Sequence, residues 1–148
     1  MLLELLDGKI QIIPSAKDWK TAIRVSAQPL LDNDSIEARY VDAMIQMCEK
    51  YDAYIVLADL FAMPHASPDS GVKKMDVALT ISKTPIDFIG KPVQILLALA
   101  SADSHSHIYA LQELSDLLED TSKIHELIQA ETVDAIADII RKALSKDN

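Results

Sequence analysis

Glycine is scarce in this chain, with only three glycines among 148 residues. Gly8, Gly71 and Gly90 cannot be combined into a Walker motif or a GxGxxG fingerprint, so nucleotide binding through those motifs is excluded. The sequence also lacks the GxSxG elbow of α/β-hydrolases and the CxxC and HExxH patterns of many zinc sites. Any chemistry therefore has to come from other side chains.

Cysteine is nearly absent, because Cys48 is the only one and cannot form a disulfide within the chain. This is typical of a reducing compartment. Val41, Met44, Ile45 and Cys48 recur at helical spacing, so we predict a helix over residues 36–51 with Cys48 buried on its apolar side. Cys48 is expected to pack in the core and to carry no chemistry.

Basic residues are also few: 14 Lys and Arg against 23 Asp and Glu give a formal charge of −9. Such a field repels a nucleic-acid backbone, and the one local basic cluster is Lys73-Lys74. The longest uncharged apolar stretch, residues 92–102, is about half of the ~20 residues that a membrane helix needs. Glu4 stands where a secretory signal would be basic. We predict a cytoplasmic protein that binds neither nucleic acid nor membrane.

Short apolar segments alternate with helical patterns along the chain. Strands are predicted at residues 10–13, 54–58, 76–82 and 93–100, with a short edge piece at 86–88. The segment 93–100 is apolar throughout, which is typical of a central strand. Ser15 and Asp18 have the form of a capping box, so a helix should begin there and bend or end near Pro29.

Helical spacing returns in the last third of the chain. One face is formed by Ile108, Leu111, Leu114 and Leu118. Another is formed by Val133, Ile136, Ala137, Ile140, Ala143 and Leu144, with a shorter helix between the two. This order of elements predicts a single α/β domain over residues 1–148, in which a sheet is covered by helices on both faces.

His65 is the first candidate for function among the four histidines. It follows Pro64, comes after a predicted buried strand and precedes a polar turn, so it should lie in a surface loop. Pro64 also biases Met63 towards an extended conformation, which would help to aim the next side chain outward. His125, in contrast, occupies a polar position of a predicted surface helix and is expected to be solvated.

His105 and His107 lie between the predicted central strand and the next helix. The carboxyl end of a strand is where open α/β sheets place ligands, and a helix N-terminus favours an anion. An ordinary polar loop is the alternative for both residues. A metal-dependent hydrolase is a further alternative, with ligands drawn from His65, His105, His107 and either Asp69 or Asp103.

The segment Ala62-Met63-Pro64-His65-Ala66, the apolar strand before it and the histidine at position 107 resemble a known family. It is the IIA component of the sugar phosphotransferase system (PTS), fructose-mannitol class. Residues 63–74, followed by Pro92-Val93 and Ala102-Asp103, are most similar to the ascorbate-specific branch. The resemblance covers nearly the whole chain. It implies a mixed sheet flanked by helices and a phosphotransferase that uses no cofactor and no metal.

The resemblance also implies roles for particular residues and partners. His65 would accept a phosphoryl group from the phosphocarrier HPr and pass it to a IIB component, which carries a cysteine in the ascorbate branch and serves a membrane IIC permease. His107 would stabilise the phosphate or orient His65, and Ser67 would help to bind the phosphate. A stand-alone regulatory IIA protein is the alternative role, and the sequence leaves a homo-oligomer open.

Two positions depart from the family pattern. Leu60 stands where the family often has a glycine, so we expect the turn before the site to be shaped differently. Cys48 stands where fructose and mannitol members carry an arginine, just before the residue that corresponds to Glu49. The site is therefore expected to lack that cation.

Overall fold

The computed structural model describes residues 2–102, 112–114, 116–117 and 120–145. Its elements are α1 (Leu2–Leu5), β1 (Ile10–Ile13), α2 (Trp19–Asp32), α3 (Ala38–Lys50), β2 (Val56–Ala58), β3 (Leu60–Ala62), η1 (Pro68–Ser70), β4 (Asp76–Phe88), β5 (Lys91–Ala100), α5 (Thr121–Gln129) and α6 (Val133–Ser145). Within these ranges the strands form a five-stranded sheet in the order β1-β4-β5-β3-β2. The β1–β4 and β3–β5 pairs are parallel and the other two pairs are antiparallel, so the sheet is mixed.

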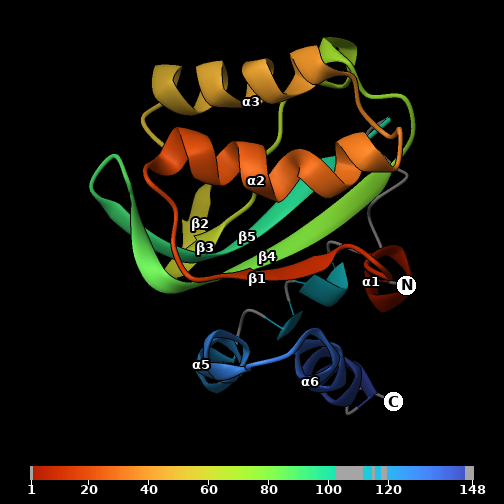
Figure 1. Ribbon diagram of the computed structural model, residues 1–148, viewed down its shortest axis with the longest axis vertical. Coiled ribbons are helices and arrows are strands. Elements are labelled where there is room, and N and C mark those ends of the chain that lie inside the picture. Colours follow the sequence, from red (N-terminus) through yellow and green to blue (C-terminus); the bar gives the residue numbers. More distant parts are fainter. Residues whose placement is uncertain (1, 103–111, 115, 118–119, 146–148) are drawn as a thin grey trace.

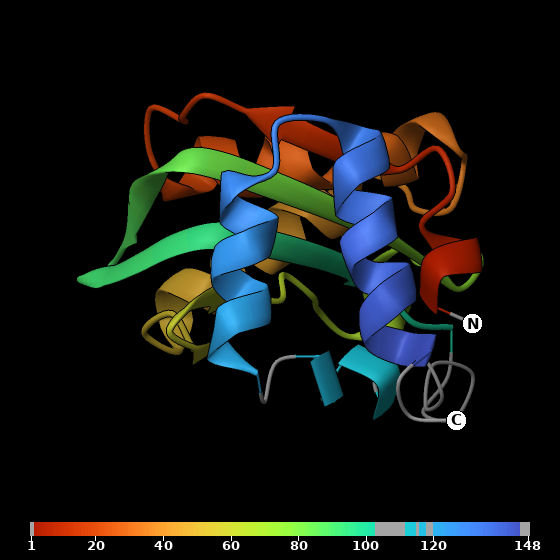
Figure 2. The same cartoon turned by 90° about the horizontal axis from the view of Figure 1, so that it is seen from below.

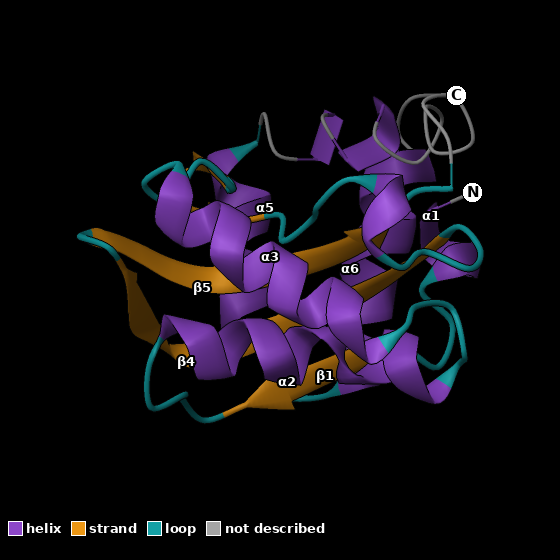
Figure 3. Ribbon diagram, turned by 90° about the horizontal axis from the view of Figure 1, so that it is seen from above, coloured by secondary structure: helices purple, strands orange, loops and turns teal. Residues whose placement is uncertain are grey.

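Helices cover both faces of this sheet (Figure 1). Helices α2 and α3 lie side by side over one face (Figure 3), and α5 and α6 lie over the other (Figure 2). Side chains alternate along β5, so that Leu96 and Ala98 pack in the cluster with α2 and α3, whereas Leu97 and Leu99 pack in the cluster with α5 and α6. The predicted α/β fold and the central position of β5 are both confirmed.

Strand β4 is one strand of 13 residues, where a strand and a separate edge piece were predicted. Its register with β5 shifts between Ile81 and Ile86, where residues 82–85 bulge opposite Gln94. The Gln94 side chain donates to two carbonyl oxygens of this bulge, at 3.0 and 3.2 Å. The alternating pattern breaks at the bulge, but the strand continues because Gln94 supplies hydrogen bonds there. Residues 86–88 pair with β5.

Helix α2 begins at Trp19, later than the predicted start after Ser15. The N-cap is Asp18, whose backbone is extended and whose carboxylate accepts a hydrogen bond from the N–H of Thr21 at 2.8 Å. The predicted capping box places Asp18 three residues after an N-cap at Ser15, whereas Asp18 is itself the N-cap and accepts from one of the free N–H groups of the first turn.

Pro29 lies inside α2 and does not end it, contrary to one of the predicted outcomes. Proline lacks the N–H that would bond to the carbonyl oxygen of Val25, four residues earlier. Nε2 of Gln11, in β1, donates to that oxygen at 2.8 Å instead. The helix therefore tolerates Pro29 because a neighbouring strand replaces the lost hydrogen bond.

Strand β2 lies at an edge of the sheet, and Leu57 in it is 54% exposed. The prediction of a buried strand beginning at Tyr54 was wrong in both respects, because β2 begins at Val56 and an unpredicted strand, β3, separates it from β5. The two strands form a tight hairpin in which Ala58 pairs with Phe61.

The remaining helices follow the predicted apolar patterns. Helix α3 lies within the predicted range and buries Cys48 completely, together with the rest of its stripe. Helix α6 buries Ile136 and Ile140 of its predicted face. The predicted face over residues 106–118 falls largely outside the described residues, although Leu114 is described and buried. In the part of the chain that the structure describes, no helix is long and apolar enough to cross a membrane.

Candidate functional site

His65 lies in the loop between β3 and η1, three residues after β3 ends at Ala62. Because β3 and β5 are parallel, this loop leaves the sheet at the edge where β5 also ends, and α/β sheets bind ligands at such edges. Pro64 is buried, His65 is half-buried and Ser67 is exposed. The structure thus places the imidazole where the chain passes from the core to the surface, as the sequence predicted.

Backbone hydrogen bonds attach this loop to its neighbours on both sides. The N–H of Met63 donates to the carbonyl oxygen of Ile55 at 2.9 Å, and the N–H of Leu99 in β5 donates to the carbonyl oxygen of Pro64 at 2.9 Å. The residues just before His65 are therefore held by the central strand and by the chain entering β2.

The His65 ring is fixed by a hydrogen bond with its own loop. Nδ1 lies 2.6 Å from the carbonyl oxygen of Met63. A carbonyl oxygen only accepts hydrogen bonds, so this contact assigns a hydrogen to Nδ1, and the lone pair of the neutral ring then belongs to Nε2. The Tyr54 ring also contacts the imidazole edge-on, with ring centres 5.2 Å apart. The nitrogen available for attack on an electrophile is Nε2.

Two tyrosine hydroxyls bind the backbone next to the ring. The hydroxyl of Tyr54 donates to the carbonyl oxygen of His65 at 3.0 Å. The N–H of Ala66 donates to the hydroxyl of Tyr40 at 3.0 Å, and that hydroxyl donates to the carbonyl oxygen of Leu99 at 2.8 Å. Burial raises the pKa of Tyr40 to about 12 and also raises the pKa of Tyr54, so both hydroxyls keep their protons at neutral pH.

Sequence reasoning did not single out either tyrosine for the site. Tyr40 lies four residues before Met44 and so extends the apolar stripe of α3 by one turn. A tyrosine buried on such a stripe needs a hydrogen-bond partner for its hydroxyl, and that requirement was the available signal.

The far end of the loop packs against the start of α3 (Figure 1). Nη1 of Arg39 donates to the carbonyl oxygen of Asp69 at 3.1 Å, and the N–H of Glu37 donates to that of Gly71 at 2.8 Å. Gly71 has a φ of +129°, and a Cβ there would lie 3.2–3.3 Å from side-chain atoms of residues 37, 39 and 40. Glycine is needed for this close approach, which anchors the loop after the histidine.

The other predicted site residues have varied settings. Ser67 precedes η1 and makes no side-chain capping hydrogen bond. His125 is exposed on α5, as predicted. His105, His107 and Asp103 lie outside the described residues. Among the residues that are described, no group of three or more His, Cys, Asp and Glu side chains is arranged to hold a metal ion.

The two departures from the family pattern have structural outcomes. Leu60 is the first residue of β3, where the chain turns back from β2, and its φ of +65° is a conformation that glycine favours. The expected difference in the shape of this turn stays a prediction, and leucine here has a backbone conformation that glycine adopts more easily. Cys48 lies in the core, where burial raises the pKa of its thiol to about 11, which agrees with the predicted packing role.

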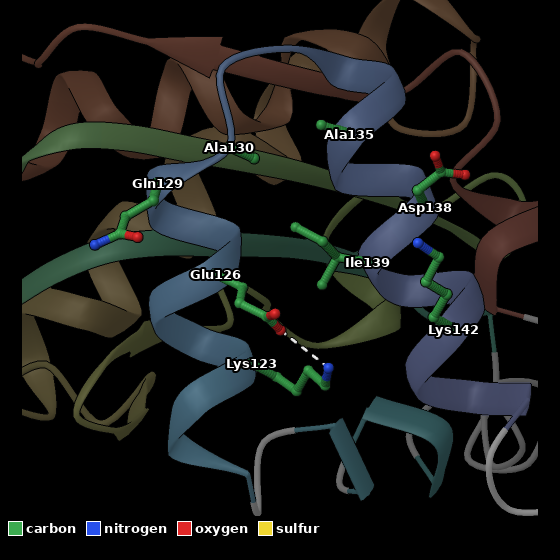
Figure 4. Close-up of a pocket in the computed structure, with 8 residues that line it drawn as sticks. All are labelled: Lys123, Glu126, Gln129, Ala130, Ala135, Asp138, Ile139 and Lys142. Atoms are coloured by element: carbon green, nitrogen blue, oxygen red, sulfur yellow. Dashed lines mark ion pairs between the residues drawn. The ribbon is translucent and has the colours of Figure 1, made fainter.

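A surface groove of about 430 Å³ lies between α5 and α6, on the other face of the sheet from α2 and α3 (Figure 4). Charged side chains of both signs line it, including Lys123 and Glu126, which form an ion pair at 3.0 Å. None of its lining residues belongs to the His65 loop. The groove is therefore separate from the candidate site.

A family model described as the phosphoenolpyruvate-dependent sugar phosphotransferase system, EIIA 2, matches residues 5–143. The chain belongs to this family. PTS enzyme IIA components are phosphotransferases, so the chain is a IIA-type phosphoryl carrier by family membership. The family and the mixed, helix-covered sheet agree with what the sequence resemblance implied.

Two relatives are similar to this IIA component over most of its length. It is 37% identical over 138 residues to the mannitol-specific cryptic phosphotransferase enzyme IIA component of Escherichia coli K12, covering 92% of this chain and 94% of the relative. The solution structure of the protein of that name from E. coli has a TM-score of 0.87, with 96% of this chain and 99% of the other covered.

An ascorbate-specific PTS system EIIA component of Shigella boydii serotype 4 is 32% identical over 135 residues, with 88% of each chain covered. The fold is also shared with enzyme IIA mannitol from E. coli in its complex with phosphorylated enzyme IIB mannitol. That structure has a TM-score of 0.77 at 20% identity and covers 90% of this chain and 94% of the other.

Proposed function

We propose that this IIA component accepts a phosphoryl group on Nε2 of His65 from phosphorylated HPr and passes it to a cysteine of a IIB component in the cytoplasm. The observation that carries the proposal is the 2.6 Å contact between Nδ1 of His65 and the carbonyl oxygen of Met63. It puts the hydrogen on Nδ1 and leaves a lone pair on Nε2 of a half-buried side chain. A neutral imidazole with one defined nucleophilic nitrogen suits reversible phosphoryl carriage.

Each transfer exchanges one bond to phosphorus for another. In the first, the Nε2 lone pair bonds to phosphorus while the bond to the HPr residue breaks and its electron pair leaves with the donor atom. In the second, the thiolate of the IIB cysteine attacks the same phosphorus, and the electron pair of the N–P bond returns to Nε2. The hydrogen bond from Nδ1 to Met63 can persist through both steps, so the ring needs no change of tautomer.

The phosphoryl group also needs hydrogen-bond donors, because charge spreads over its equatorial oxygens in the transition state. The proposed donors are Ser67, which is exposed two residues after His65, and backbone N–H groups of the loop. His107 is proposed as a further donor, on the sequence resemblance alone. Unchanged transfer by His107→Ala or Ser67→Ala would remove the corresponding residue from this set.

The partner and substrate assignments rest on the family. The solved complex pairs a IIA domain of this fold with a phosphorylated IIB, which supports a IIB as the acceptor. We propose an ascorbate-type uptake system with a IIC permease, on the similarity of residues 63–74, while the relatives carry both mannitol and ascorbate names. Onward transfer to ascorbate-type and mannitol-type IIB proteins, measured in parallel, distinguishes the two systems.

The test of the phosphoryl acceptor is incubation with phosphorylated HPr followed by intact-mass measurement. The wild type should gain one phosphoryl group and His65→Ala should gain none. His125→Ala is the matched control, because it removes an exposed histidine from α5 and should be labelled like the wild type. Undiminished labelling of His65→Ala would refute the assignment. Labelling of the wild type with no transfer to either IIB would favour the stand-alone regulatory role.

A further inference from the structure

The peptide unit between His65 and Ala66 is held at both ends by tyrosine hydroxyls. Its carbonyl oxygen accepts from the hydroxyl of Tyr54, and its N–H donates to the hydroxyl of Tyr40, each at 3.0 Å. Tyr40 comes from α3, whereas Tyr54 comes from the segment before β2. Rotation of this peptide plane would break at least one of the two hydrogen bonds, so the backbone that carries the imidazole is fixed from two directions.

Tyr40 is itself held firmly. Its side chain is completely buried, and its hydroxyl donates to the carbonyl oxygen of Leu99 while it accepts from Ala66. The N–H of Leu99 in turn donates to the carbonyl oxygen of Pro64. These hydrogen bonds link Tyr40 in α3 to Leu99 in the central strand, and both of them to the residues on either side of the histidine.

Tyr54 acts on the side chain as well as on the backbone. Its ring meets the His65 ring edge-on with centres 5.2 Å apart, at an interplanar angle of 69°. It also contacts the ring of Tyr51, with centres 6.0 Å apart. The imidazole is thus bounded by an aromatic ring while its Nδ1 is bonded to Met63.

We propose that Tyr40 and Tyr54 are positioning residues for phosphoryl transfer, which keep the His65 backbone in the one arrangement where Nδ1 bonds to Met63 and Nε2 stays unprotonated. This inference rests on the proposed role of His65. The side chain of a neutral histidine in water prefers its hydrogen on Nε2. That tautomer has its lone pair on Nδ1 and none on Nε2. The hydrogen bond from Nδ1 to Met63 opposes this preference, and the two tyrosine hydroxyls hold the adjoining His65 peptide in the arrangement in which that hydrogen bond is made.

The direct test is the tautomer of His65, read from the ¹⁵N chemical shifts of its ring in the full chain. The wild type should show a hydrogen on Nδ1. Tyr54→Phe and Tyr40→Phe each remove one hydroxyl and keep the ring, and each should raise the fraction with the hydrogen on Nε2 by about two- to tenfold, the effect of one hydrogen bond. Tyr51→Phe, which makes the same change on the neighbouring ring, should leave the wild-type tautomer.

The second readout is the single-turnover rate of phosphoryl transfer from phosphorylated HPr. Each of the Tyr40 and Tyr54 variants should lower the rate constant about two- to tenfold, with little change in the HPr concentration at half-saturation. The rate constant of the double variant should fall by a smaller factor than the product of the two single-variant factors, since both hydroxyls act on one peptide unit. Amide spectra that match the wild type away from the loop establish that each variant is folded, and Tyr54→Phe provides the test should Tyr40→Phe unfold.

Wild-type tautomer and wild-type rates in folded Tyr54→Phe would overturn the proposal. Failure of the proposed function is a separate result. If phosphorylated HPr does not label the wild type at His65, the phosphoryl-transfer role is refuted. The positioning proposal for that transfer is then refuted as well, even if the His65 tautomer changes in the tyrosine variants. A wild type labelled at His65 whose tyrosine variants keep both tautomer and rate would refute the positioning role alone.

Discussion

Leu60 should carry backbone strain that glycine would relieve. Its φ of +65° lies in the left-handed region, where a side chain costs about 1–2 kcal/mol. Glycine avoids that cost but loses about 0.5–1 kcal/mol more conformational entropy than alanine on folding. Because alanine and glycine both lack the leucine side chain beyond Cβ, their comparison isolates the backbone. From the mid-range values of these two costs, we expect Leu60→Gly to be about 0.75 kcal/mol more stable than Leu60→Ala.

Leu57 is the matched control for this comparison. It lies three residues earlier, in β2, is 54% exposed and does not belong to the residues with positive φ. At this position the alanine variant should be more stable than the glycine variant by about 0.5–1 kcal/mol. The difference in the free energy of unfolding between the glycine and alanine variants should therefore have opposite signs at positions 57 and 60. Equilibrium urea unfolding of the four variants measures both differences. If the glycine variant is no more stable than the alanine variant at position 60, while the Leu57 pair behaves as expected, the strain assigned to Leu60 does not exist.

Three further predictions concern stability. Gln11→Leu should lower the free energy of unfolding by about 1–2 kcal/mol, because a carbonyl loses its donor, and adding Pro29→Ala should restore part of this loss in urea unfolding by supplying the missing N–H. Lys83→Met should cost about 1–2 kcal/mol and weaken hydrogen-exchange protection in α5, since Nζ donates to two carbonyl oxygens at the end of that helix. Burial raises the pKa of Tyr40 from 10.0 to about 12 and that of Cys48 from 9.0 to about 11, so above about pH 9 the unfolded chain releases protons that the folded chain keeps. Stability should be unaffected by these groups below pH 9 and should fall between pH 9 and 12, less steeply in Tyr40→Phe, as measured by the urea midpoint.

The parts of the fold that could be predicted are those encoded by local periodicity. The stripe ending at Cys48 gave helix α3 to within two residues, and the apolar run over residues 93–100 identified the central strand. Strand β1 has the predicted bounds, because Pro14 ends the pattern directly after Ile13. In each case the signal and the structure it specifies involve neighbouring residues.

The parts that failed depend on contacts between distant residues. Pro29 predicts a bend or an end of the helix, but the β1–β4 pairing places Gln11 where its side chain supplies the hydrogen bond that proline lacks. The sequence pattern over the bulge in β4 predicts a strand end, but Gln94 in β5 lies opposite the bulge and donates hydrogen bonds to it. Leu60 itself gave no local signal of a positive φ, since leucine seldom adopts that conformation, and only the family resemblance marked a turn there. A local pattern contains none of these partners.

The candidate site divides in the same way. The placement of His65 in a loop followed from its neighbours in sequence, although the strand directly before that loop, β3, was not predicted, and the family resemblance assigned its role. The nitrogen that carries the lone pair depends on the distance from Nδ1 to Met63, which no sequence pattern reports. The hydroxyls of Tyr40 and Tyr54 reach the loop from 26 and 11 residues away, so their contribution required the folded arrangement.

Strand β4 has a consequence for cooperativity. Leu79 and Ile81 pack in the cluster with α5 and α6, whereas Ala78, Ile86 and Phe88 pack in the cluster with α2 and α3. One strand therefore forms a wall of both hydrophobic cores, and neither core can come apart without exposing part of the other. The two helical layers should unfold as a single unit, and the histidine loop, attached to the strand next to β4, should keep its protection from hydrogen exchange until that unit opens.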